Sequence, residues 1–358
     1  MKQYLLILVI SFIFIGCAQQ QSVYMQAPSE KYTQEMRFDH APVTQKPFSF
    51  LDSKQRVAIV FPSKVVGKYA TGAINTTISY MLYQNKEFAL DVIDSYDEDK
   101  ASIKAAMASL FEKKYKKVIL LFTEDSLPFL NQMSGLDNLT IYMPLINIKE
   151  SALQYSNITY GGIDYERQME KLLTLSNGKN AIFYEDSLLG DKLKEIILQQ
   201  HSNIILNTKI DRVRNDYKTI VTNPKIEDAT LFLHTTIIKS SILLSQLRAQ
   251  EATPYVILST QLNYTPLIVS LTQYLDRKDF IVANSIEKTK PKLEELITLL
   301  DSDIVYNWVN YSTLIGINYL YENQKSDLIS NPIRANQVQF NTTLLKNTPY
   351  GFKKYNTN

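Results

Sequence analysis

The sequence is poor in the residue types that catalysis and metal binding use most. Its 358 residues include one cysteine, three histidines and ten glycines. One cysteine cannot form a disulfide within the chain, so a hydrophobic core must hold the fold. His40, His201 and His234 are too scattered for a metal set or a Ser-His-Asp triad. Because G-x-S-x-G, G-x-G-x-x-G and Walker patterns are absent as well, we expect no enzyme activity, no metal and no cofactor.

The sequence also lacks an excess of charge of either sign. It has 38 basic and 36 acidic side chains, and no basic stripe appears, so we expect no nucleic-acid partner. The densest acidic run, Asp94 and Asp97-Glu98-Asp99, contains no glycine to hold the tight turn of a calcium loop. Because a helix is expected directly after this run, the acids are interpreted as favourable charges at a helix start.

The only long apolar run lies near the N-terminus. Leu5 to Ile15 would rise about 16 Å as a helix, too little for a hydrocarbon core of about 30 Å, and predicts a signal-peptide core. The sequence Phe14-Ile15-Gly16-Cys17 at its end resembles the bacterial lipobox, in which the cysteine is acylated and becomes the new N-terminus. The resemblance implies a signal peptide at 1–16 and a lipid on Cys17; the alternative is an ordinary cleaved signal with an incidental cysteine. Ala18, in place of an aspartate, implies attachment to the outer membrane, with the folded part in the periplasm.

Residues 17–53 show neither a helical nor a strand period. Gln19-Gln20-Gln21, Pro28, Pro42 and Pro47 belong to a polar segment that cannot bury enough apolar surface to order itself. We expect a flexible tether that lets the folded part stand some tens of ångströms from the membrane.

From residue 54 onward, apolar strands alternate with amphipathic helices. In the unit Asn180 to Gln200, a buried strand is expected first, then the loop Glu185-Asp186-Ser187, then a helix from Leu188. Near-continuous Val/Ile/Leu strands between such helices predict an α/β fold with parallel sheets covered on both faces. About ten strands favour two sheets, with ligands in the crevice outside the strands' carboxyl ends. The other expected strands lie at 56–62, 88–93, 117–122, 139–146, 157–163, 203–210, 230–234, 255–259 and 280–283.

Three of the expected helices matter for the site. They lie at 70–84, 102–113 and 236–250. The helix at 236–250 is expected to place Ile238, Ile242, Leu243 and Leu247 on its inner face.

Several stretches follow one another in a characteristic order between Arg56 and Tyr321. They are Phe61-Pro62-Ser63 with Gly67 and Gly72-Ala73-Ile74; Asp94-Ser95-Tyr96-Asp97; Tyr184-Glu185-Asp186-Ser187 with Gly190; and Asp228-Ala229 with Ser245-Gln246-Leu247-Arg248 and Pro254-Tyr255-Val256-Ile257. This order resembles the type I periplasmic-binding-protein superfamily, the two-lobed fold of amino-acid solute receptors. The resemblance implies a first lobe at 54–150 and 286–330, a second lobe at 151–285, and a crevice between them.

The C-terminal stretch narrows the resemblance. Gln337-Val338-Gln339-Phe340, Leu344-Leu345 and Tyr350-Gly351-Phe352 are similar to the strand pair and aromatic-glycine ending of one branch of the superfamily. Members of that branch are outer-membrane lipoproteins that activate penicillin-binding proteins, so strands and a tail are expected at 331–358. The branch implies an envelope protein partner such as a peptidoglycan synthase. The receptor fold implies instead a small-molecule ligand for an importer or sensor, and both hypotheses stay open.

The resemblance also implies where a ligand would bind. Amino-acid receptors of the superfamily hold the ligand carboxylate with hydroxyls and backbone amides of first-lobe loops, and an acid pairs with the ammonium group. Each candidate here would equally serve to cap a helix or close a turn. In addition, Lys64-Val65-Val66 replaces the small Ser/Gly-rich run of the receptors. The candidates are Ser63, Thr123, Glu124 and Ser126 in the first lobe, and Tyr184, Asp186, Ser187, Gln261 and Asn263 in the second.

Tyrosine is abundant, with 23 residues in the chain. Tyr306, Tyr311, Tyr319 and Tyr321 crowd the last helical region together with Trp308. A tyrosine can pack its ring and still donate a hydrogen bond, so the group fits a wet crevice, a protein interface or a core.

Overall fold

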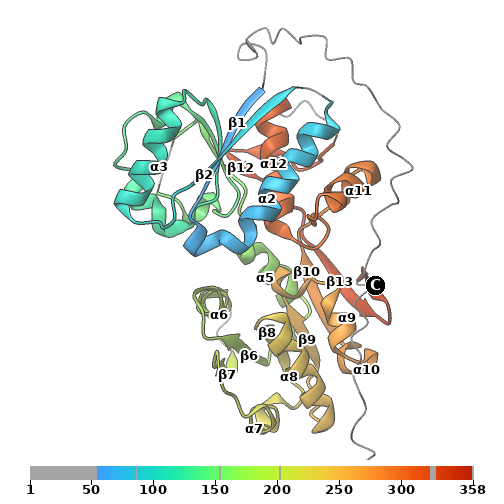
Figure 1. Ribbon diagram of the computed structural model, residues 1–358. Helices are drawn as coiled ribbons and strands as arrows, with labels where there is room; N and C mark the ends of the chain where they lie inside the picture. The colour runs from blue at the N-terminus through green and yellow to red at the C-terminus, as the bar shows by residue number, and fades with distance from the viewer. Residues whose placement is uncertain (1–54, 86, 153–154, 201–202, 323–327, 357–358) are drawn as a thin grey trace, which may run out of the picture. The chain divides into compact units, whose positions relative to one another are not determined.

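Figure 1 shows the computed structural model, which describes residues 55–85, 87–152, 155–200, 203–322 and 328–356. The expected signal peptide, Cys17 and the tether at 17–53 lie outside the described residues. Within the described part, every helix is too short or too polar to cross a bilayer.

The described chain builds two seven-stranded sheets. The strand order is β11-β12-β5-β4-β3-β1-β2 in the first sheet and β14-β13-β10-β9-β8-β6-β7 in the second. Neighbouring strands pair in parallel, except that an antiparallel ribbon closes one edge of each sheet. The prediction of an α/β fold with two parallel sheets is therefore confirmed. The strands are β1 (Gln55–Phe61), β2 (Phe88–Asp94), β3 (Lys117–Leu120), β4 (Thr140–Met143), β5 (Ile158–Tyr160), β6 (Asn180–Glu185), β7 (Ile204–Ile210), β8 (Thr230–His234), β9 (Val256–Ser259), β10 (Phe280–Asn284), β11 (Ile333–Arg334), β12 (Gln337–Val338), β13 (Thr343–Thr348) and β14 (Gly351–Lys354).

Helices pack on both faces of each sheet, and we call each sheet with its helices a lobe. The first lobe carries α2 (Ser63–Tyr83), α3 (Lys100–Glu112), α4 (Leu127–Leu130), α11 (Pro291–Leu299) and α12 (Trp308–Glu322). The second lobe carries α5 (Tyr165–Leu173), α6 (Leu188–Gln200), α7 (Tyr217–Val221), α8 (Ile237–Ala249), α9 (Leu267–Leu271) and α10 (Tyr274–Arg277).

The chain passes from the first sheet to the second later than expected. β5 pairs with β4, so the passage follows Tyr160, whereas the expected boundary stands at residue 150. The C-terminal strands do not form a unit of their own: β11 and β12 join the first sheet, and β13 and β14 join the second. Strand pairing decides these memberships, and the spacing of apolar residues carries no information about it.

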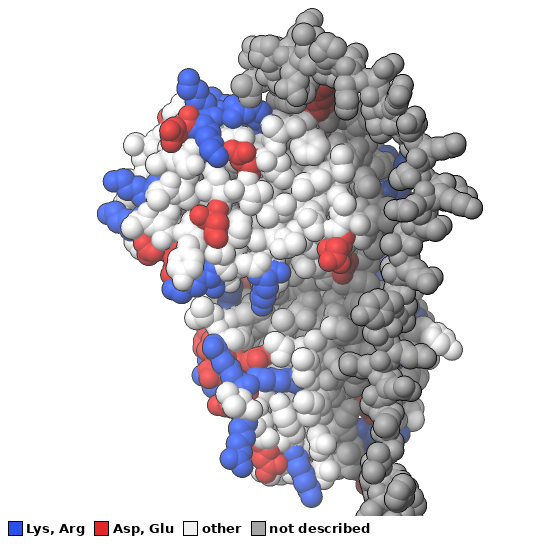
Figure 2. Space-filling model, viewed as in Figure 1, with Lys and Arg blue, Asp and Glu red and all other residues white. Residues whose placement is uncertain are grey.

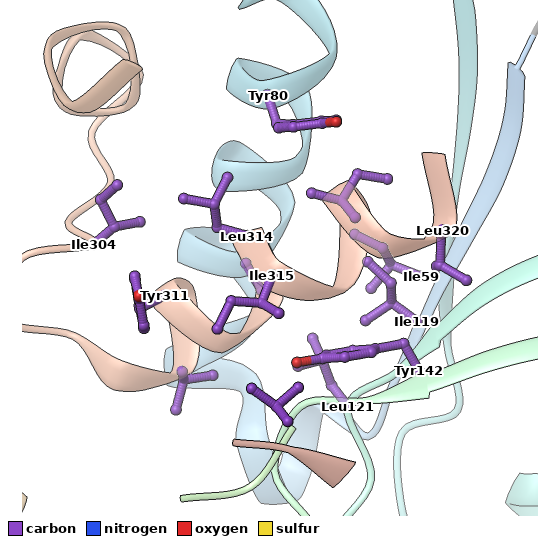
Figure 3. Packing of buried hydrophobic residues seen from close by; sticks show 14 of the residues in the cluster. Ile59, Tyr80, Ile119, Leu121, Tyr142, Ile304, Tyr311, Leu314, Ile315 and Leu320 are labelled. Atoms are coloured by element: carbon purple, nitrogen blue, oxygen red, sulfur yellow. The ribbon is translucent and has the colours of Figure 1, made fainter. Parts of the chain in front are cut away.

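The first lobe is held by two hydrophobic clusters, one on each face of its sheet. Along β1, Val57 and Ile59 contribute to one cluster, and Ala58 and Val60 to the other, as the two-residue period of a strand requires. Helices α2 and α12 lie side by side on the first face (Figure 1). They enclose Tyr80 and several branched aliphatic side chains above the sheet (Figure 3).

Helix α12 sits against the sheet more closely than most helices can. A Cβ atom at Gly316 would lie 2.2 Å from Cδ1 of Tyr142, so only glycine fits there. Tyr311 of α12 is buried and donates a 2.6 Å hydrogen bond to Asn331. Trp308, Tyr319 and Tyr321 pack partly buried around the same cluster. This aromatic group is chiefly part of the core of the first lobe.

Two expected helices differ from those observed. Helix α2 begins at Ser63, directly after β1, so the glycine-bearing loop expected around Gly67 is helical. Helix α8 buries Leu243 and Leu247 as expected, but it leaves Ile238 and Ile242 exposed. The side chains that complete its inner face are serines and Leu244, and a pattern that counts only apolar residues rotates the helix wrongly.

Of the acidic run before α3, Asp99 serves the helix start as expected, whereas Asp94, Asp97 and Glu98 bind other parts of the chain. Asp99 is the N-cap of α3, and its carboxylate accepts hydrogen bonds of 2.8 and 3.1 Å from the backbone N–H groups of Ala101 and Ser102. Glu98, the residue before it, has a different role that only the structure reveals.

Candidate functional site

In each sheet the strand order reverses at one point, between β1 and β3 in the first lobe and between β6 and β8 in the second. In open α/β sheets, ligands bind in the crevice outside the carboxyl ends of the strands at such a point. The residues that follow these strands therefore define the candidate site, and most of the predicted residues belong to this set.

In the first lobe, the place beside the reversal point is filled by the side chain of Glu98. Glu98 lies in the loop after β2, and its carboxylate accepts hydrogen bonds from the backbone N–H and the hydroxyl of Thr123, just beyond β3. Since β1 lies between β2 and β3, this side chain reaches across the end of β1. Glu98 is only 6% exposed, and burial raises its pKa even though both Thr123 groups favour the charged form. The amide and hydroxyl predicted at Thr123 are therefore already engaged.

In the second lobe, the corresponding place is filled by Glu185, the last residue of β6. Its carboxylate accepts a 2.8 Å hydrogen bond from the backbone N–H of Thr236 and forms a 2.6 Å ion pair with Lys239 in α8. The two paired side chains are 14% and 12% exposed. Burial acts to raise the pKa of Glu185, but the hydrogen bonds from Lys239 and Thr236 outweigh it and hold that pKa below its usual value.

A glycine allows this arrangement. Gly190, in the first turn of α6, packs against the end of β6, and a Cβ atom there would lie 2.1 Å from the carbonyl oxygen of Glu185. Ser187 accepts a 3.1 Å hydrogen bond from the N–H of Gly190 and so closes the turn into α6. Ser187, one of the predicted ligand-binding residues, thus uses its hydroxyl at a helix start, which is the alternative given for such residues.

The first strand end offers little to a ligand. Ser63 donates its backbone N–H to Asp94 at 3.0 Å, and Lys64 forms an ion pair with Asp97. Burial acts to raise the pKa of Asp94, but hydrogen bonds from Ser63 and Tyr96 hold it below its usual value. Ser63 therefore belongs to the contact between α2 and the loop after β2.

Lys192 of α6 connects the second lobe with the first. Its ammonium group pairs with Glu124 at 2.8 Å and also with Glu150. Burial disfavours the charged ammonium, but the two glutamates outweigh this and raise the pKa of Lys192. Glu124, one of the predicted ligand-binding residues, thus pairs with an ammonium group of the chain itself.

A second lysine makes a similar connection near the passage between the lobes. Lys149 pairs with Asp164 at 3.0 Å and with Glu166 at 2.6 Å. A cavity of about 220 Å³ lies among these ion pairs. Its lining is largely charged, and each charged side chain of the lining already forms an ion pair within the chain.

The other predicted residues serve the second lobe. Tyr184 is nearly buried, and the ammonium group of Lys194 lies 5.1 Å from the centre of its ring. Asp186 forms a 2.7 Å ion pair with Lys209 at the surface. The predicted residues before α6 thus contact neighbouring side chains of their own lobe.

Gln261 and Asn263 lie in a short 3-10 turn after β9 and are buried. Gln261 donates a 3.1 Å hydrogen bond to Asn284 and accepts one of 2.6 Å from the backbone N–H of Ser285. Asn263 donates a 2.8 Å hydrogen bond to the hydroxyl of Ser259. The Gln261 amide thus ties the end of β9 to the end of β10, and the Asn263 amide holds the turn against β9.

The residues that fill the candidate site were not predicted for it from the sequence. Glu98 was interpreted as a helix-start charge, and Glu185 as part of a loop motif. A signal existed for both, since each stands at the carboxyl end of an expected strand, where side chains gather in this class of fold. For Lys192, on a helix face, the sequence offered no comparable signal.

Comparison with known proteins identifies the architecture. No protein-family model matches the sequence, and no curated protein is similar enough to count as a relative. Among solved structures, a proposed branched-chain amino acid ABC transporter protein from Rhodospirillum rubrum superposes with a TM-score of 0.63 at 11% identity, covering 84% of this chain and 100% of the other. The chain has the type I periplasmic-binding-protein fold. This confirms the fold that the ordered motifs implied.

Two further structures show how widely this fold is used. The substrate-binding protein LivJ of Streptococcus pneumoniae, solved with isoleucine, superposes with a TM-score of 0.56 at 9% identity, covering 84% of this chain and 98% of LivJ. LpoA of Haemophilus influenzae superposes with a TM-score of 0.56 at 10% identity, covering 87% of this chain and 61% of LpoA. At such identities the likeness concerns the fold alone, and the chain spans less than two thirds of LpoA.

Proposed function

We propose that this protein is a non-catalytic outer-membrane lipoprotein whose binding-protein-like domain acts in the periplasm as a scaffold or regulator of an envelope assembly, such as the one that synthesises peptidoglycan. The observation that carries the proposal is the state of the crevice. Beside the reversal points of both sheets, the chain's own carboxylates, Glu98 and Glu185, occupy donors that would serve a ligand. A solute receptor needs these donors free for its ligand.

The contacts between the lobes support the same proposal. A receptor of this fold closes its lobes on a ligand by hinge motion. Here Lys192 of the second lobe already pairs with acids of the first lobe, and Lys149 of the first lobe with acids of the second. The cavity beside these pairs is lined by paired charges. Lobes that are joined by ion pairs without a ligand suit a surface that contacts other proteins.

The surface of the second lobe supports a protein partner. Six large apolar side chains are exposed on the neighbouring helices α8, α9 and α10, where a monomer usually exposes such residues singly. On the face shown in Figure 2, charges of both signs are interspersed, and neither sign forms a broad field. The six residues are Ile238, Ile242, Leu267, Leu271, Tyr274 and Leu275.

Site-specific photocrosslinking in the native bacterium tests the proposal. A photoreactive amino acid at Ile238 or Leu275 should crosslink to a peptidoglycan synthase, which a fluorescent penicillin identifies on a gel. Val213 is a matched control, since it is an exposed apolar residue of the same lobe outside α8–α10. Equal crosslinking from Val213, or crosslinked bands that never carry the penicillin label, would count against peptidoglycan synthesis as the assembly.

Membrane attachment is tested separately. Labelled palmitate should enter the wild-type protein, and Cys17→Ser should abolish the labelling and release the protein from outer-membrane fractions. Two acyl chains anchor a protein stably, since each buried methylene contributes about 0.8 kcal/mol. A protein that stays in the outer membrane without label would need another anchor.

The alternative is a solute receptor for an amino acid or a related small anion, serving an importer or sensor. It is favoured by the shared fold with LivJ, which was solved with isoleucine. A thermal-unfolding screen of residues 18–358 with amino acids, peptides and muropeptides separates the two functions. A true ligand at 100 times its dissociation constant adds about 2.7 kcal/mol to the unfolding free energy. If none stabilises the protein, the receptor alternative is excluded for these compounds.

A further inference from the structure

A cavity of about 370 Å³ lies where the chain passes for the last time between the two sheets. This passage, residues 339–342, joins β12 of the first sheet to β13 of the second. None of the residues of the candidate functional site lines the cavity, so it is separate from that site. Its polar lining comes from the end of α5, the passage and the end of β14, and includes Lys171, Thr174, Asn341, Thr342, Lys354 and Tyr355.

The lining carries positive charge that no described acid neutralises. Lys171 is half-buried, and its ammonium group donates a hydrogen bond to the backbone carbonyl oxygen of Thr342. An ammonium group has three N–H donors, so two remain for another partner. Neither Lys171 nor Lys354 forms an ion pair with a described residue, and no acid lines the cavity. In the cavity beside Lys149, by contrast, every charged side chain of the lining is paired.

Each lysine also has an ordinary structural reason for its place. Lys171 lies in the last turn of α5, where a positive charge interacts favourably with the helix dipole. Lys354 lies on β14, an edge strand, where a charged side chain discourages pairing with another chain. Neither reason explains why both lysines line one cavity from which acids are missing. Two ammonium groups in that arrangement are complementary to an anion.

The neutral groups of the lining add hydrogen-bonding capacity. The side-chain amide of Asn341 and the hydroxyl of Tyr355 form no hydrogen bond with the described residues. An amide and a phenol each donate and accept, so they match a ligand that carries hydroxyl groups.

The size of the cavity excludes a bare anion as the whole ligand. Its volume is roughly twelve times the ~30 Å³ that a water molecule occupies in the liquid, and acetate or phosphate would leave most of it empty. It lies within the range of about 300–1,000 Å³ that is usual for small-molecule sites. A single sugar ring with an acidic substituent meets the requirements of both size and chemistry.

We propose that this cavity binds an acidic sugar, with the acidic group at Lys171 and Lys354 and the sugar hydroxyls at Asn341 and Tyr355. The acidic group is a carboxylate if the sugar belongs to a cell-wall glycan, and a phosphate if it belongs to a lipopolysaccharide. The site requires no protein partner, so this proposal and the scaffold function are tested by different experiments.

Calorimetric titration of residues 18–358, which include every described residue, tests the proposal. N-acetylmuramic acid and glucosamine 6-phosphate are the two acidic probes, and N-acetylglucosamine is the neutral sugar of similar size. At least one acidic probe should bind about tenfold more tightly than the neutral sugar, since a charge-assisted contact to an ammonium group is lost in the latter. Its affinity should decline with added sodium chloride, because the site is open to solvent. The acidic probe that binds more tightly identifies the source of the sugar.

Three variants locate the binding. Lys354→Gln and Lys171→Met should each weaken the acidic probe by about tenfold and leave the weak binding of the neutral sugar unchanged. Lys353→Gln is the matched control, because Lys353 is the neighbouring exposed lysine of β14 and does not line the cavity. It should bind the acidic probe as the wild type does. If Lys171→Met does not fold, Lys354→Gln decides alone, since it changes an exposed side chain.

The outcomes decide the proposal in either direction. Preference for an acidic sugar that depends on Lys354 and not on Lys353 supports it. Equal binding of the neutral sugar, equal loss in Lys353→Gln, or binding of acetate or inorganic phosphate as tight as that of the sugars overturns it. It is also overturned if neither acidic sugar binds with a dissociation constant below about 1 mM. None of these results bears on crosslinking from Ile238 or Leu275.

Discussion

The two lobes each place a glutamate at the carboxyl end of the sheet, but different groups bind the two carboxylates. Each has a glutamate at the carboxyl end of its sheet whose carboxylate binds a backbone N–H beyond another strand of the same sheet, Glu98 in the first lobe and Glu185 in the second. In the second lobe burial acts to raise the pKa of Glu185, but the ion pair with Lys239 outweighs burial, and the pKa is lowered. In the first lobe burial prevails, and the pKa of Glu98 is raised. The comparison teaches that position in the fold sets the hydrogen bond, while the neighbouring side chains set the charge state.

The largest effect is expected from breaking the neutralised pair of the second lobe. Lys239→Met leaves the Glu185 carboxylate poorly solvated and unpaired, and should lower the unfolding free energy by about 2–3 kcal/mol, somewhat less than for a fully buried pair. Urea unfolding at pH 7 measures it. Glu185→Gln together with Lys239→Met should recover most of the loss, and a single-variant loss below about 0.5 kcal/mol would contradict the role given to Lys239.

A second asymmetry between the lobes is His234, a wholly buried histidine at the end of β8. Burial lowers the pKa of His234 to about 3, and neither ring nitrogen has a hydrogen-bond partner among the described residues. Below about pH 6.5 the histidine takes up a proton in the unfolded chain but stays neutral in the folded protein. The contribution of His234 to the unfolding free energy is therefore present above that pH and is lost as pH falls. At pH 5 the loss should be about 2 kcal/mol relative to pH 7.

The control for this prediction is His234→Phe, which keeps an aromatic ring of similar size. The unfolding free energy of this variant should fall less steeply between pH 7 and pH 5 than that of the wild type. Near pH 5 the two slopes should differ by the uptake of about one proton on unfolding, roughly 1.4 kcal/mol per pH unit. Parallel pH profiles of the two proteins would show that His234 titrates normally.

The two glutamates should give opposite pH signatures. Glu98 has a folded pKa above its unfolded value near 4.5. Its contribution to the unfolding free energy is therefore present below that pH and is lost as pH rises through the folded pKa. Glu185 has a folded pKa below its unfolded value near 4.5, so its contribution is present above that pH and is lost as pH falls through the folded pKa.

Urea unfolding of the wild type, Glu98→Gln and Glu185→Gln across pH 4 to 7.5 measures this contrast. Relative to its glutamine variant, the wild type should lose stability with rising pH at Glu98 and gain it at Glu185. At pH 7, Glu185→Gln should cost on the order of 1–2 kcal/mol, the scale of a charge-assisted hydrogen bond. The same sign of slope at both positions would remove the contrast between the lobes.

The smallest effect is expected at the ion pairs that join the lobes. The side chains of Lys192, Glu124 and Glu150 are 32%, 50% and 20% exposed, so water and salt weaken their pairing. A double-mutant cycle of Lys192→Met with Glu150→Gln should give a coupling of about 0.5–1 kcal/mol that declines at high salt. Lys194, which pairs with Asp191 and Glu195 on its own helix, is the matched control within one lobe.

The structure adds to the sequence-based predictions at some places and differs from them at others, each for a physical reason. Ser63, Thr123 and Glu124 lie near strand ends as predicted, but a neighbouring side chain of the chain engages each of them. The loop expected after β1 is helical because α2 starts at the strand end. Ile238 and Ile242 were assigned to the inner face of α8, whereas that face is completed by serines that bond to backbone carbonyl groups.

The sequence by itself determined the alternation of strands and helices, because a buried strand and a half-buried helix need different apolar periods over a few residues. It also determined that polar residues follow the strand ends. Only the tertiary structure decided which sheet each strand joins and which side chain meets which donor. Glu98 and Thr123 are 25 residues apart in the chain and meet only because β1 stands between β2 and β3. Such meetings depend on strand order, and strand order is a property of pairing between distant segments that local patterns do not encode.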